Sequence, residues 1–396
     1  MFKAHLQAAV LMGTAAAVFA VSPASSQDAP PPAKSQEMVP AFAGRPGVPA
    51  GDYNASSRSA ADEALPNPYA RDESFFKVPK NLKLGSAGGI AIDKDGHSIW
   101  IYQRCGGQDV CIDSHEPVLW KFDSNGNLVK AIVVDQVVYP HGFSIGPDGN
   151  LWITDLQSNV DLSALPRAEK GRHFPAGTAP NGADVLEFSP EGKLLMRLGT
   201  PGVYGSDDAH FSQPSAVAVA ANGDIFVADG HDSKPANNRI VKFDKSGKFV
   251  KSWPTCQPDD ARQIDCSHAL AIDSQGRLFV GNRGNNEIDI FDEDGKLLDR
   301  WTQFGKPSGL FIDKNDVLYV GDSESSVRNG NSYVRGLHIG DARTGQVKAF
   351  LPDPLGNPVP WNPLRGTTGP EGVAAADGYI YASQVTPPGL VRYSLK

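Results

Sequence analysis

The sequence predicts an all-β protein, a single six-bladed β-propeller, and three observations carry this prediction. Glycine and proline are abundant, with 41 and 31 of the 396 residues, which favours tight turns over long helices. A pair of strands joined by a turn recurs six times, and most copies continue into two further strands. The last copy ends one strand short. Units of four short strands indicate propeller blades, because one small sheet can bury both faces only between neighbouring sheets.

The recurring strand pair has a constant form. An apolar strand is followed by a turn rich in Asp, Asn and Gly, and a second strand of apolar and aromatic residues returns alongside it. The six copies are GGIAIDKDGHSIWIYQR (88–104), HGFSIGPDGNLWITD (141–155), SAVAVAANGDIFVAD (215–229), HALAIDSQGRLFVGN (268–282), SGLFIDKNDVLYVGD (308–322) and EGVAAADGYIYASQ (371–384).

The final repeat supplies only a third strand, LVRYSLK, before the chain ends. Its fourth strand must come from elsewhere, and the segment ESFFKVPKNL (73–82) is the natural donor. Pairing of this N-terminal strand with the last blade would close the ring and leave no exposed edge there. We therefore expect one propeller domain over residues 73–396.

The N-terminal residues predict export. Residues 1–26 combine Lys3 and His5 with an apolar stretch and end in small residues, as a secretory signal peptide does, whereas a membrane anchor would be longer. Residues 27–72 are rich in Pro and Ala, which predicts a disordered linker or a loose N-terminal wrap. The mature protein is expected to be secreted or periplasmic, with no membrane partner.

Charge and cysteine content agree with an exported protein. The formal net charge of −8 and the absence of a basic block argue against a nucleic-acid partner. An oxidising compartment permits disulfides, and the spacing favours two local pairs, Cys105 with Cys111 and Cys256 with Cys266. A structural zinc site would require other spacings.

Aligning the repeats places a ring of residues at the start of the first strand of each blade. First strands line the central channel of a propeller, so the ring should surround the axis. Alternate blades carry His141, His268 and Glu371, separated by small residues. Two His and one Glu with a water form a well-precedented catalytic zinc site, so we expect Zn²⁺ here. The alternative for any single histidine is a hydrogen-bonded filler of the channel. The ring consists of Gly88, His141, Ser215, His268, Ser308 and Glu371.

One strand later, a second ring reads mostly Asp, Asn or Gln, and such residues commonly anchor neighbouring backbone in repeats. Just beyond this ring stand Arg104, Arg283 and His231. Two arginines and a histidine at one channel mouth suit an anionic ligand, because guanidinium groups bind carboxylates bidentately. Salt bridges to channel acids are the alternative for either arginine. The second ring consists of Gln103, Asp155, Asp229, Asn282, Asp322 and Gln384.

Together these residues resemble the peptidyl-α-hydroxyglycine α-amidating lyase family, within the wider NHL-repeat propellers. The resemblance covers most of the chain after residue 85. It is carried by WIYQR, PHGFSIGPDGNLWITD, HFSQPSAVAVAANGDIFVADG and SHALAIDSQGRLFVGNRGNNEI. It implies a six-bladed propeller that cleaves peptidyl-α-hydroxyglycine to a peptide amide and glyoxylate at a channel zinc. By motif, His141 and His268 match zinc histidines of the family, and Arg104 and Arg283 match active-site arginines.

The chain departs from the family pattern at two positions of the site. The family's third zinc ligand is a His followed by Asp, where this chain has Glu371 and Gly372, so the family's structural Ca²⁺ is not expected to carry over. The family's active-site Tyr follows an Asp-Gly pair, where this chain has His231, which could serve as the base.

Three functions remain open from the sequence. The first is a zinc-dependent carbon–nitrogen lyase in which His231 takes a proton, Arg104 and Arg283 hold a carboxylate, and the substrate is a small molecule or peptide. The second is a calcium- or zinc-dependent lactonase of the gluconolactonase type, with Glu371, Asn282 and Asp229 or Asp155 around a hard cation. The third is a non-catalytic propeller that binds a partner on its rim. The sequence predicts no oligomeric state.

Overall fold

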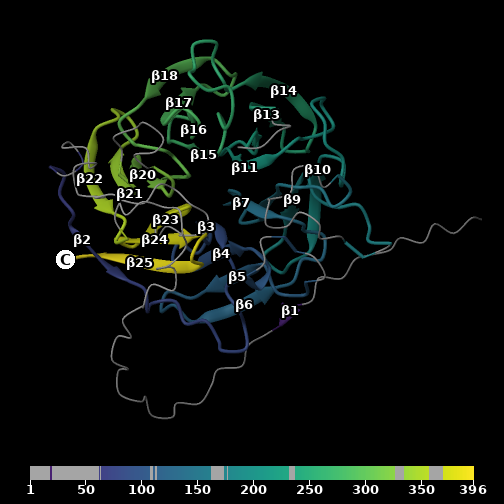
Figure 1. The fold of residues 1–396 in the computed structure, drawn as a ribbon, viewed down its shortest axis with the longest axis horizontal. Helices are drawn as coiled ribbons and strands as arrows, with labels where there is room; N and C mark the ends of the chain where they lie inside the picture. Colours follow the sequence, from purple (N-terminus) through teal and green to yellow (C-terminus); the bar gives the residue numbers. More distant parts are fainter. Residues whose placement is uncertain are drawn as a thin grey trace, which may run out of the picture.

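Six β-sheets surround a central axis in the computed structural model, which confirms the predicted six-bladed propeller (Figure 1). The structure describes residues 62, 64–107, 110–111, 114–161, 174–175, 177–231, 237–325, 334–355 and 369–396, and the backbone of 18–19. Apart from the backbone of 18–19, the predicted signal peptide lies outside the described residues, and so does most of the predicted linker. Within the described part of the chain, no helix has the length and apolarity that crossing a membrane requires.

The blades follow the chain in order, each with its first strand at the channel. Blade 1 comprises β3 (Ala87–Ile92), β4 (Ile99–Gln103), β5 (Leu119–Phe122) and β6 (Leu128–Ile132), with β1 (Val18–Phe19) paired outside β6. Blade 2 comprises β7 (Pro140–Ile145), β8 (Leu151–Asp155), β9 (Asp184–Phe188) and β10 (Leu194–Leu198). Blade 3 comprises β11 (Pro214–Val219), β12 (Ile225–Asp229), β13 (Arg239–Phe243) and β14 (Phe249–Pro254).

The remaining blades complete the circle. Blade 4 comprises β15 (Ala269–Ile272), β16 (Leu278–Asn282), β17 (Glu287–Phe291) and β18 (Leu297–Trp301). Blade 5 comprises β19 (Gly309–Ile312), β20 (Val317–Asp322), β21 (Gly336–Asp341) and β22 (Val347–Pro352). Blade 6 comprises β23 (Gly372–Ala376), β24 (Tyr379–Gln384) and β25 (Gly389–Leu395), with β2 (Tyr69–Asp72) as its outer strand.

An N-terminal strand closes the ring as predicted, but it is not the expected segment. The closing strand is β2, which pairs antiparallel with β25, whereas 73–82 was expected. The Asp72 carboxylate accepts hydrogen bonds from the backbone and hydroxyl of Ser74, and this turn ends the strand. Phe75 and Phe76 are both buried after the turn, which alternation along an edge strand would not allow.

The inner strands approach one another closely because small residues follow the ring residues. A Cβ added at Gly142 of β7 would lie 2.4 Å from the carbonyl oxygen of Ser215 in the next blade. Only glycine allows that approach. The close packing brings His141 of one blade within reach of side chains from the blades beside it.

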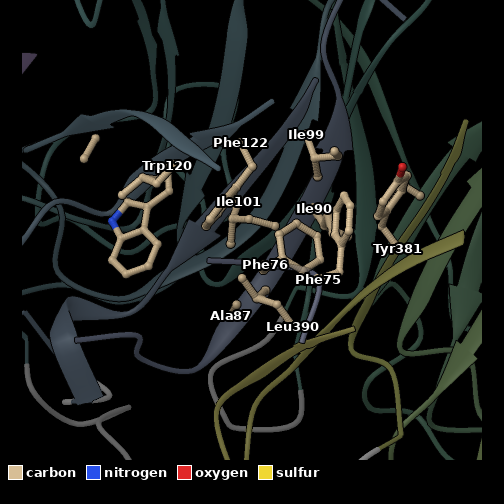
Figure 2. Close-up of a cluster of buried hydrophobic side chains, with 13 residues drawn as sticks. Phe75, Phe76, Ala87, Ile90, Ile99, Ile101, Trp120, Phe122, Tyr381 and Leu390 are labelled. Atoms are coloured by element: carbon tan, nitrogen blue, oxygen red, sulfur yellow. The ribbon is translucent and has the colours of Figure 1, made fainter. Parts of the chain in front are cut away.

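Apolar clusters between adjacent blades form the core, and one of them joins the first blade to the last. Phe76 lies in this cluster, with its ring centroid 5.0 Å from Phe75, 5.0 Å from Phe122 and 6.0 Å from Tyr381 (Figure 2). Phe122 belongs to blade 1 and Tyr381 to blade 6. The residues that follow the closing strand therefore seal the ring from within.

Replacing Phe76 with alanine should destabilise the protein by about 3–5 kcal/mol, because a buried aromatic side chain is lost at a junction that cannot collapse freely. Chemical denaturation measures this change. Val129→Ala is the control, since Val129 is 45% exposed on the outer strand β6. Equal stability of the two variants would contradict the sealing role of Phe76.

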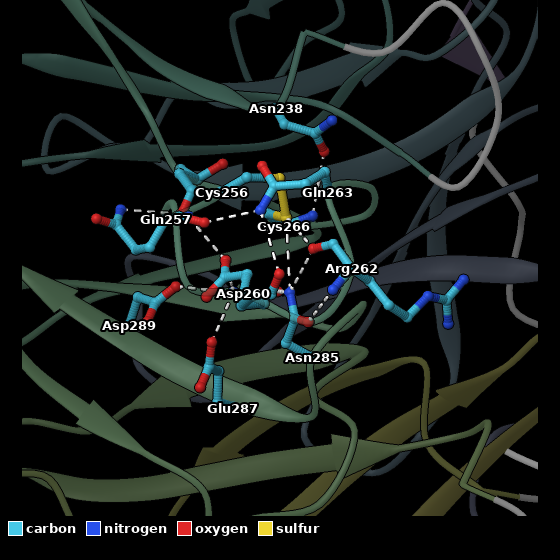
Figure 3. Close-up of a disulfide and its surroundings, with 12 residues drawn as sticks. Asn238, Cys256, Gln257, Asp260, Arg262, Gln263, Cys266, Asn285, Glu287 and Asp289 are labelled. Carbon is cyan, nitrogen blue, oxygen red and sulfur yellow. Dashed lines mark hydrogen bonds between the residues drawn. A yellow bond between two sulfur atoms is a disulfide. The ribbon is translucent and has the colours of Figure 1, made fainter. Parts of the chain in front are cut away.

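Both predicted disulfides are present, Cys105–Cys111 and Cys256–Cys266. The first follows Arg104 directly. The second closes a loop between blades 3 and 4 and lies beside a cluster of acidic side chains (Figure 3).

In this acidic cluster, Glu287 and Asp289 lie on β17 and face Asp260 of the disulfide loop and Arg300 of β18. The Arg300 Nε atom is 3.3 Å from Asp289 Oδ1, and its Nη1 atom is 3.4 Å from Asp260 Oδ1. Burial, followed by the charge of Asp289, raises the pKa of Glu287 from 4.5 to about 7, although Arg300 opposes the shift. Burial likewise raises the pKa of Asp289 to about 6. The single positive charge of Arg300 therefore does not balance the negative charges of Asp260, Glu287 and Asp289.

Glu287→Gln should therefore make the protein more stable at pH 8. A raised pKa means that the folded protein binds more protons than the unfolded chain, so the free energy of unfolding falls as the pH rises from 4.5 to 7. The variant should gain about 1–3 kcal/mol at pH 8 and show a shallower pH dependence of stability. Glutamine can still accept the hydrogen bond that Asn282 donates to Glu287. Denaturation at pH 5 and pH 8, with exposed Glu191→Gln as the control, measures the effect, and equal pH slopes for wild type and E287Q would refute it.

Candidate metal centre in the central channel

The first ring predicted from the repeats lines the central channel. Its members border one cavity of about 260 Å³ that is walled by the inner strands of all six blades. The predicted alternation of ligand-type and small residues is therefore a spatial arrangement and not only a feature of the alignment. The ring residues on the cavity wall are Gly88, His141, Ser215, His268, Ser308 and Glu371.

His141 and His268 are buried, 5% and 2% exposed, and each is oriented by the next blade. His141 Nδ1 lies 2.8 Å from the Ser215 carbonyl oxygen, and His268 Nδ1 lies 2.9 Å from that of Ser308. A hydrogen on Nδ1 can donate to these carbonyls, which leaves Nε2 with a lone pair. This orientation by a second group is typical of metal-binding histidines.

His231 completes the group. It follows β12 of blade 3, and its Nε2 atom lies 3.1 Å from Nε2 of His141. The ring centroids of His231 and His268 are 5.1 Å apart, and those of His141 and His268 are 5.0 Å apart. Ligand atoms of the three histidines all lie within 4.8 Å of one another, which is close enough to hold one metal ion.

The three-histidine group differs from the predicted ligand set. The structure brings His141 and His268 together as expected, but it groups them with His231, which was expected to be a base, and not with Glu371. The Glu371 Oε1 atom lies 3.6 Å from Nε2 of His268, and the closer contact of this carboxylate is made by Oε2, which accepts a hydrogen bond from Ser323. Glu371 is therefore a neighbour of the three-histidine group in this structure.

The donor atoms fit a metal ion. Nε2 of His268 is buried and has no hydrogen-bond partner among the described residues. Burying an unpaired polar atom costs free energy unless another group, such as a metal ion, binds it. Burial, followed by nearby positive charge, lowers the pKa of His141 and of His268 well below the ordinary value of 6.5. Both imidazoles therefore stay neutral, the form that binds a metal.

Glu371 is a buried carboxylate beside this group. Its Oε2 atom accepts a hydrogen bond of 2.6 Å from the Ser323 hydroxyl, and its Oε1 atom lies 3.8 Å from Arg283 Nη1. Burial raises the pKa of Glu371, and the positive charge of Arg283 partly offsets that shift. The carboxylate is thus held by one hydroxyl and one arginine at the edge of the three-histidine group.

The two predicted arginines reach the same region from different blades. Arg104 follows β4, donates from Nε to the carbonyl of Pro140 at 3.2 Å, and stacks on the ring of Tyr139 at 4.3 Å. Its charge contributes to the lowered pKa of His141, so Arg104 lies near the three-histidine group.

Arg283 follows β16 and lies among carboxylates. Its Nε atom donates to Asp265 at 2.7 Å, and its Nη1 atom donates to Glu324 at 3.2 Å. Glu324 also accepts a hydrogen bond of 2.7 Å from Lys306. The salt bridges considered from the sequence are therefore present at Arg283.

Two members of the second ring anchor neighbouring backbone, as the sequence indicated. Asp155 accepts hydrogen bonds from the backbone of Val138 and Tyr139, and Asp229 accepts them from Ser212 and Gln213. Each of these carboxylates fixes the loop that leads into its own blade. Asp155 and Asp229, which the lactonase hypothesis offers as ligands of a calcium ion, are thus already engaged by backbone.

Three residues lie at the candidate site in ways that the sequence did not predict. The sequence predicted His231 as a base at the channel mouth, because it comes two residues after Asp229 of the second ring. It did not predict that His231 would lie close to His141 and His268. Asp265 and Glu324 were missed. The signal for Asp265 would have been its position next to Cys266, but nothing in the repeats marks Glu324.

Comparison with known proteins supports the resemblance. No family model matches the chain. A Caenorhabditis elegans protein named as a peptidyl-α-hydroxyglycine α-amidating lyase is 26% identical over 333 residues, which cover 79% of this chain and 83% of that protein. Human NHL repeat-containing protein 3 is 28% identical over 64% of this chain and 66% of its own length. Mouse peptidyl-glycine α-amidating monooxygenase is 34% identical over 47% of this chain, but the match covers only 18% of the mouse protein. The chain thus has homologues under both names that the sequence suggested.

Solved structures agree on the fold. A gluconolactonase from Xanthomonas campestris matches with a TM-score of 0.51 at 14% identity, covering 79% of this chain and 87% of that one. At such identity the similarity shows the propeller fold alone.

Proposed function

We propose that this protein is an exported metal-dependent lyase that cleaves N-acyl-α-hydroxyglycines to an amide and glyoxylate. The observation that carries the proposal is a three-histidine group in the channel with a buried carboxylate and two arginines around it. Homologues named for this reaction support the choice of substrate class. The two disulfides support an oxidising compartment.

His141, His231 and His268 would hold the metal, and Zn²⁺ suits three neutral imidazoles. A bound zinc would act as a Lewis acid that lowers the pKa of the substrate hydroxyl. This assignment moves His231 from base to ligand.

The arginines would bind the substrate carboxylate and so orient the molecule. Arg104 and Arg283 approach the metal-binding group from blades 1 and 4. A carboxylate between them would place the adjacent carbon, which bears the hydroxyl and the amide nitrogen, toward the histidines. Fixing the reacting carbon in this way lowers the entropic cost of reaction.

Glu371 is the proposed proton acceptor. The hydroxyl loses its proton to Glu371, its oxygen forms the carbonyl of glyoxylate, and the carbon–nitrogen bond breaks with its electrons on nitrogen. Return of the proton to that nitrogen gives the amide, so atoms and electrons balance without a co-reactant. The Ser323 hydroxyl and Arg283 hold Glu371 in place for this transfer.

An assay with N-benzoyl-α-hydroxyglycine tests the function. We expect glyoxylate and benzamide in equal amounts, loss of the activity after chelation, and its return with Zn²⁺. Absence of glyoxylate from metal-loaded protein would refute the proposal. Hydrolysis of gluconolactone in a parallel assay, without glyoxylate release, would support the lactonase alternative instead.

A further inference from the structure

The loop closed by the Cys256–Cys266 disulfide packs against the back of an active-site arginine. This loop spans residues 256–266 and meets the turn at 283–286, between β16 and β17. The two segments approach so closely that a Cβ at Gly284 would lie 2.0 Å from the carbonyl oxygen of Ile264. Asp265 lies at this contact, one residue before Cys266.

Asp265 binds both the side chain of Arg283 and the turn that carries it. Its carboxylate accepts the 2.7 Å hydrogen bond from Arg283 Nε, and its carbonyl accepts one of 2.8 Å from the backbone of Gly284. Asp265 and Arg283 are 3% and 2% exposed, so this ion pair is shielded from water. Asp265 has a φ of 60°, a left-handed conformation that few residues other than Gly, Asn and Asp adopt readily.

The disulfide loop is held in place on several sides (Figure 3). The backbone N–H of Arg262 donates to the side-chain oxygen of Asn285 at 2.8 Å, and the side-chain amide of Asn285 donates to the carbonyl of Arg262 at 2.9 Å. The Cys266 backbone donates to Asn238 at 3.1 Å. The disulfide then fixes Cys266, and with it the adjacent Asp265, relative to the start of the loop. Such cross-linking restricts the positions that the loop can adopt.

The opposite end of the Arg283 side chain points to the metal centre. While Nε is held by Asp265, Nη1 contacts Glu324 and lies 3.8 Å from Glu371. A planar guanidinium fixed at Nε has little freedom to turn. The hydrogen bond from Nε to Asp265 therefore fixes the orientation of the Arg283 guanidinium.

We propose that Asp265, held by the Cys256–Cys266 disulfide, is a positioning residue that aims Arg283 at the substrate carboxylate. The part that concerns substrate rests on the proposed function, whereas the orientation of Arg283 does not. The contacts of Asp265 described above are with Arg283 and with the turn that carries it, so its proposed effect on the substrate is exerted through the arginine.

Asp265→Asn is the main test, because asparagine keeps the left-handed backbone and a hydrogen-bond acceptor but removes the charge. Asp259→Asn is the matched control. It makes the same change in the same loop, at a side chain that is 77% exposed and contacts Arg300. We expect KM for N-benzoyl-α-hydroxyglycine to rise by about tenfold in D265N, with kcat changed by less than about threefold and metal content unchanged. D259N should behave as wild type.

An NMR measurement keeps the inference separate from the proposed function. The Arg283 Nε–H signal, identified by its loss in R283K, should shift or exchange faster in D265N and stay unchanged in D259N. If wild-type protein releases no glyoxylate, the proposed function fails and this signal alone decides the orientation. An unchanged signal and an unchanged KM in D265N would overturn the proposal.

The disulfide itself is tested by the Cys256→Ser, Cys266→Ser double variant. It should shift the same Nε–H signal and raise KM while the metal content stays that of wild type. A folded double variant with the wild-type signal would show that Asp265 positions Arg283 without the disulfide. That result would overturn the claim that the disulfide holds Asp265 in place. If the double variant does not fold, D265N still tests whether Asp265 positions Arg283.

Discussion

His268→Ala is expected to remove both the bound metal and the activity. His268 supplies a buried Nε2 atom without a hydrogen-bond partner among the described residues, and the Ser308 carbonyl orients the ring from the other side. Two imidazoles without the third should bind zinc much more weakly, and turnover should fall on the order of a thousandfold or more. Elemental analysis of purified protein and the glyoxylate assay measure the two effects.

His115→Ala is the control for this substitution. His115 lies 3.7 Å from Asp135 in an ion pair, and its side chain is 89% exposed. This variant should keep the metal and the activity of wild type. A folded H268A protein that still carries one metal ion and turns over normally would rule out the three-histidine centre.

The repeats predicted the fold and the placement of several candidate site residues, because both depend on position within a blade. Every blade begins with a strand at the channel, so aligning the copies was enough to place His141, His268 and Glu371 on one wall. The same alignment placed Arg104 and Arg283 beyond the second ring. The short spacing along the chain likewise sufficed to pair Cys105 with Cys111 and Cys256 with Cys266.

The parts that sequence could not predict depend on connections between blades. His231 lies in a loop after β12, and its approach to His141 arises from side-chain direction, which no repeat position encodes. The closing strand was expected too late in the chain, because the adjacent Phe75 and Phe76 resemble part of a strand. In the structure they follow the strand and fill the junction between the first and last blades, where they contact Tyr381 and Phe122. Asp265 acts across a loop that the repeats do not share.

The proposed exchange of roles between His231 and Glu371 has a physical basis in their surroundings. His231 is half-buried and close to two neutral imidazoles, where a third nitrogen can complete a metal site. Glu371 is already engaged by Ser323 and lies near Arg283, so its charge is compensated without a metal. A carboxylate held in this way beside a metal-binding group is suited to accept a proton.

Glu371→Gln separates these roles. Glutamine has nearly the same shape and can still accept the hydrogen bond from Ser323, but it cannot take the proton of the substrate hydroxyl. We expect the metal content of wild type and a fall in kcat on the order of a hundredfold to ten-thousandfold.

Glu324→Gln is the matched variant for Glu371→Gln. Glu324 contacts the same arginine, Arg283, at 3.2 Å, whereas the carboxylate beside His268 is that of Glu371. Its removal should alter KM by a few-fold at most and leave the metal in place. If E371Q instead loses metal and turnover together, Glu371 is a ligand, as its place in the first ring predicted, and His231 returns to the role of base. Unchanged kcat in E371Q with the metal bound would exclude Glu371 from both roles, because neither a lost ligand nor a lost base leaves turnover intact.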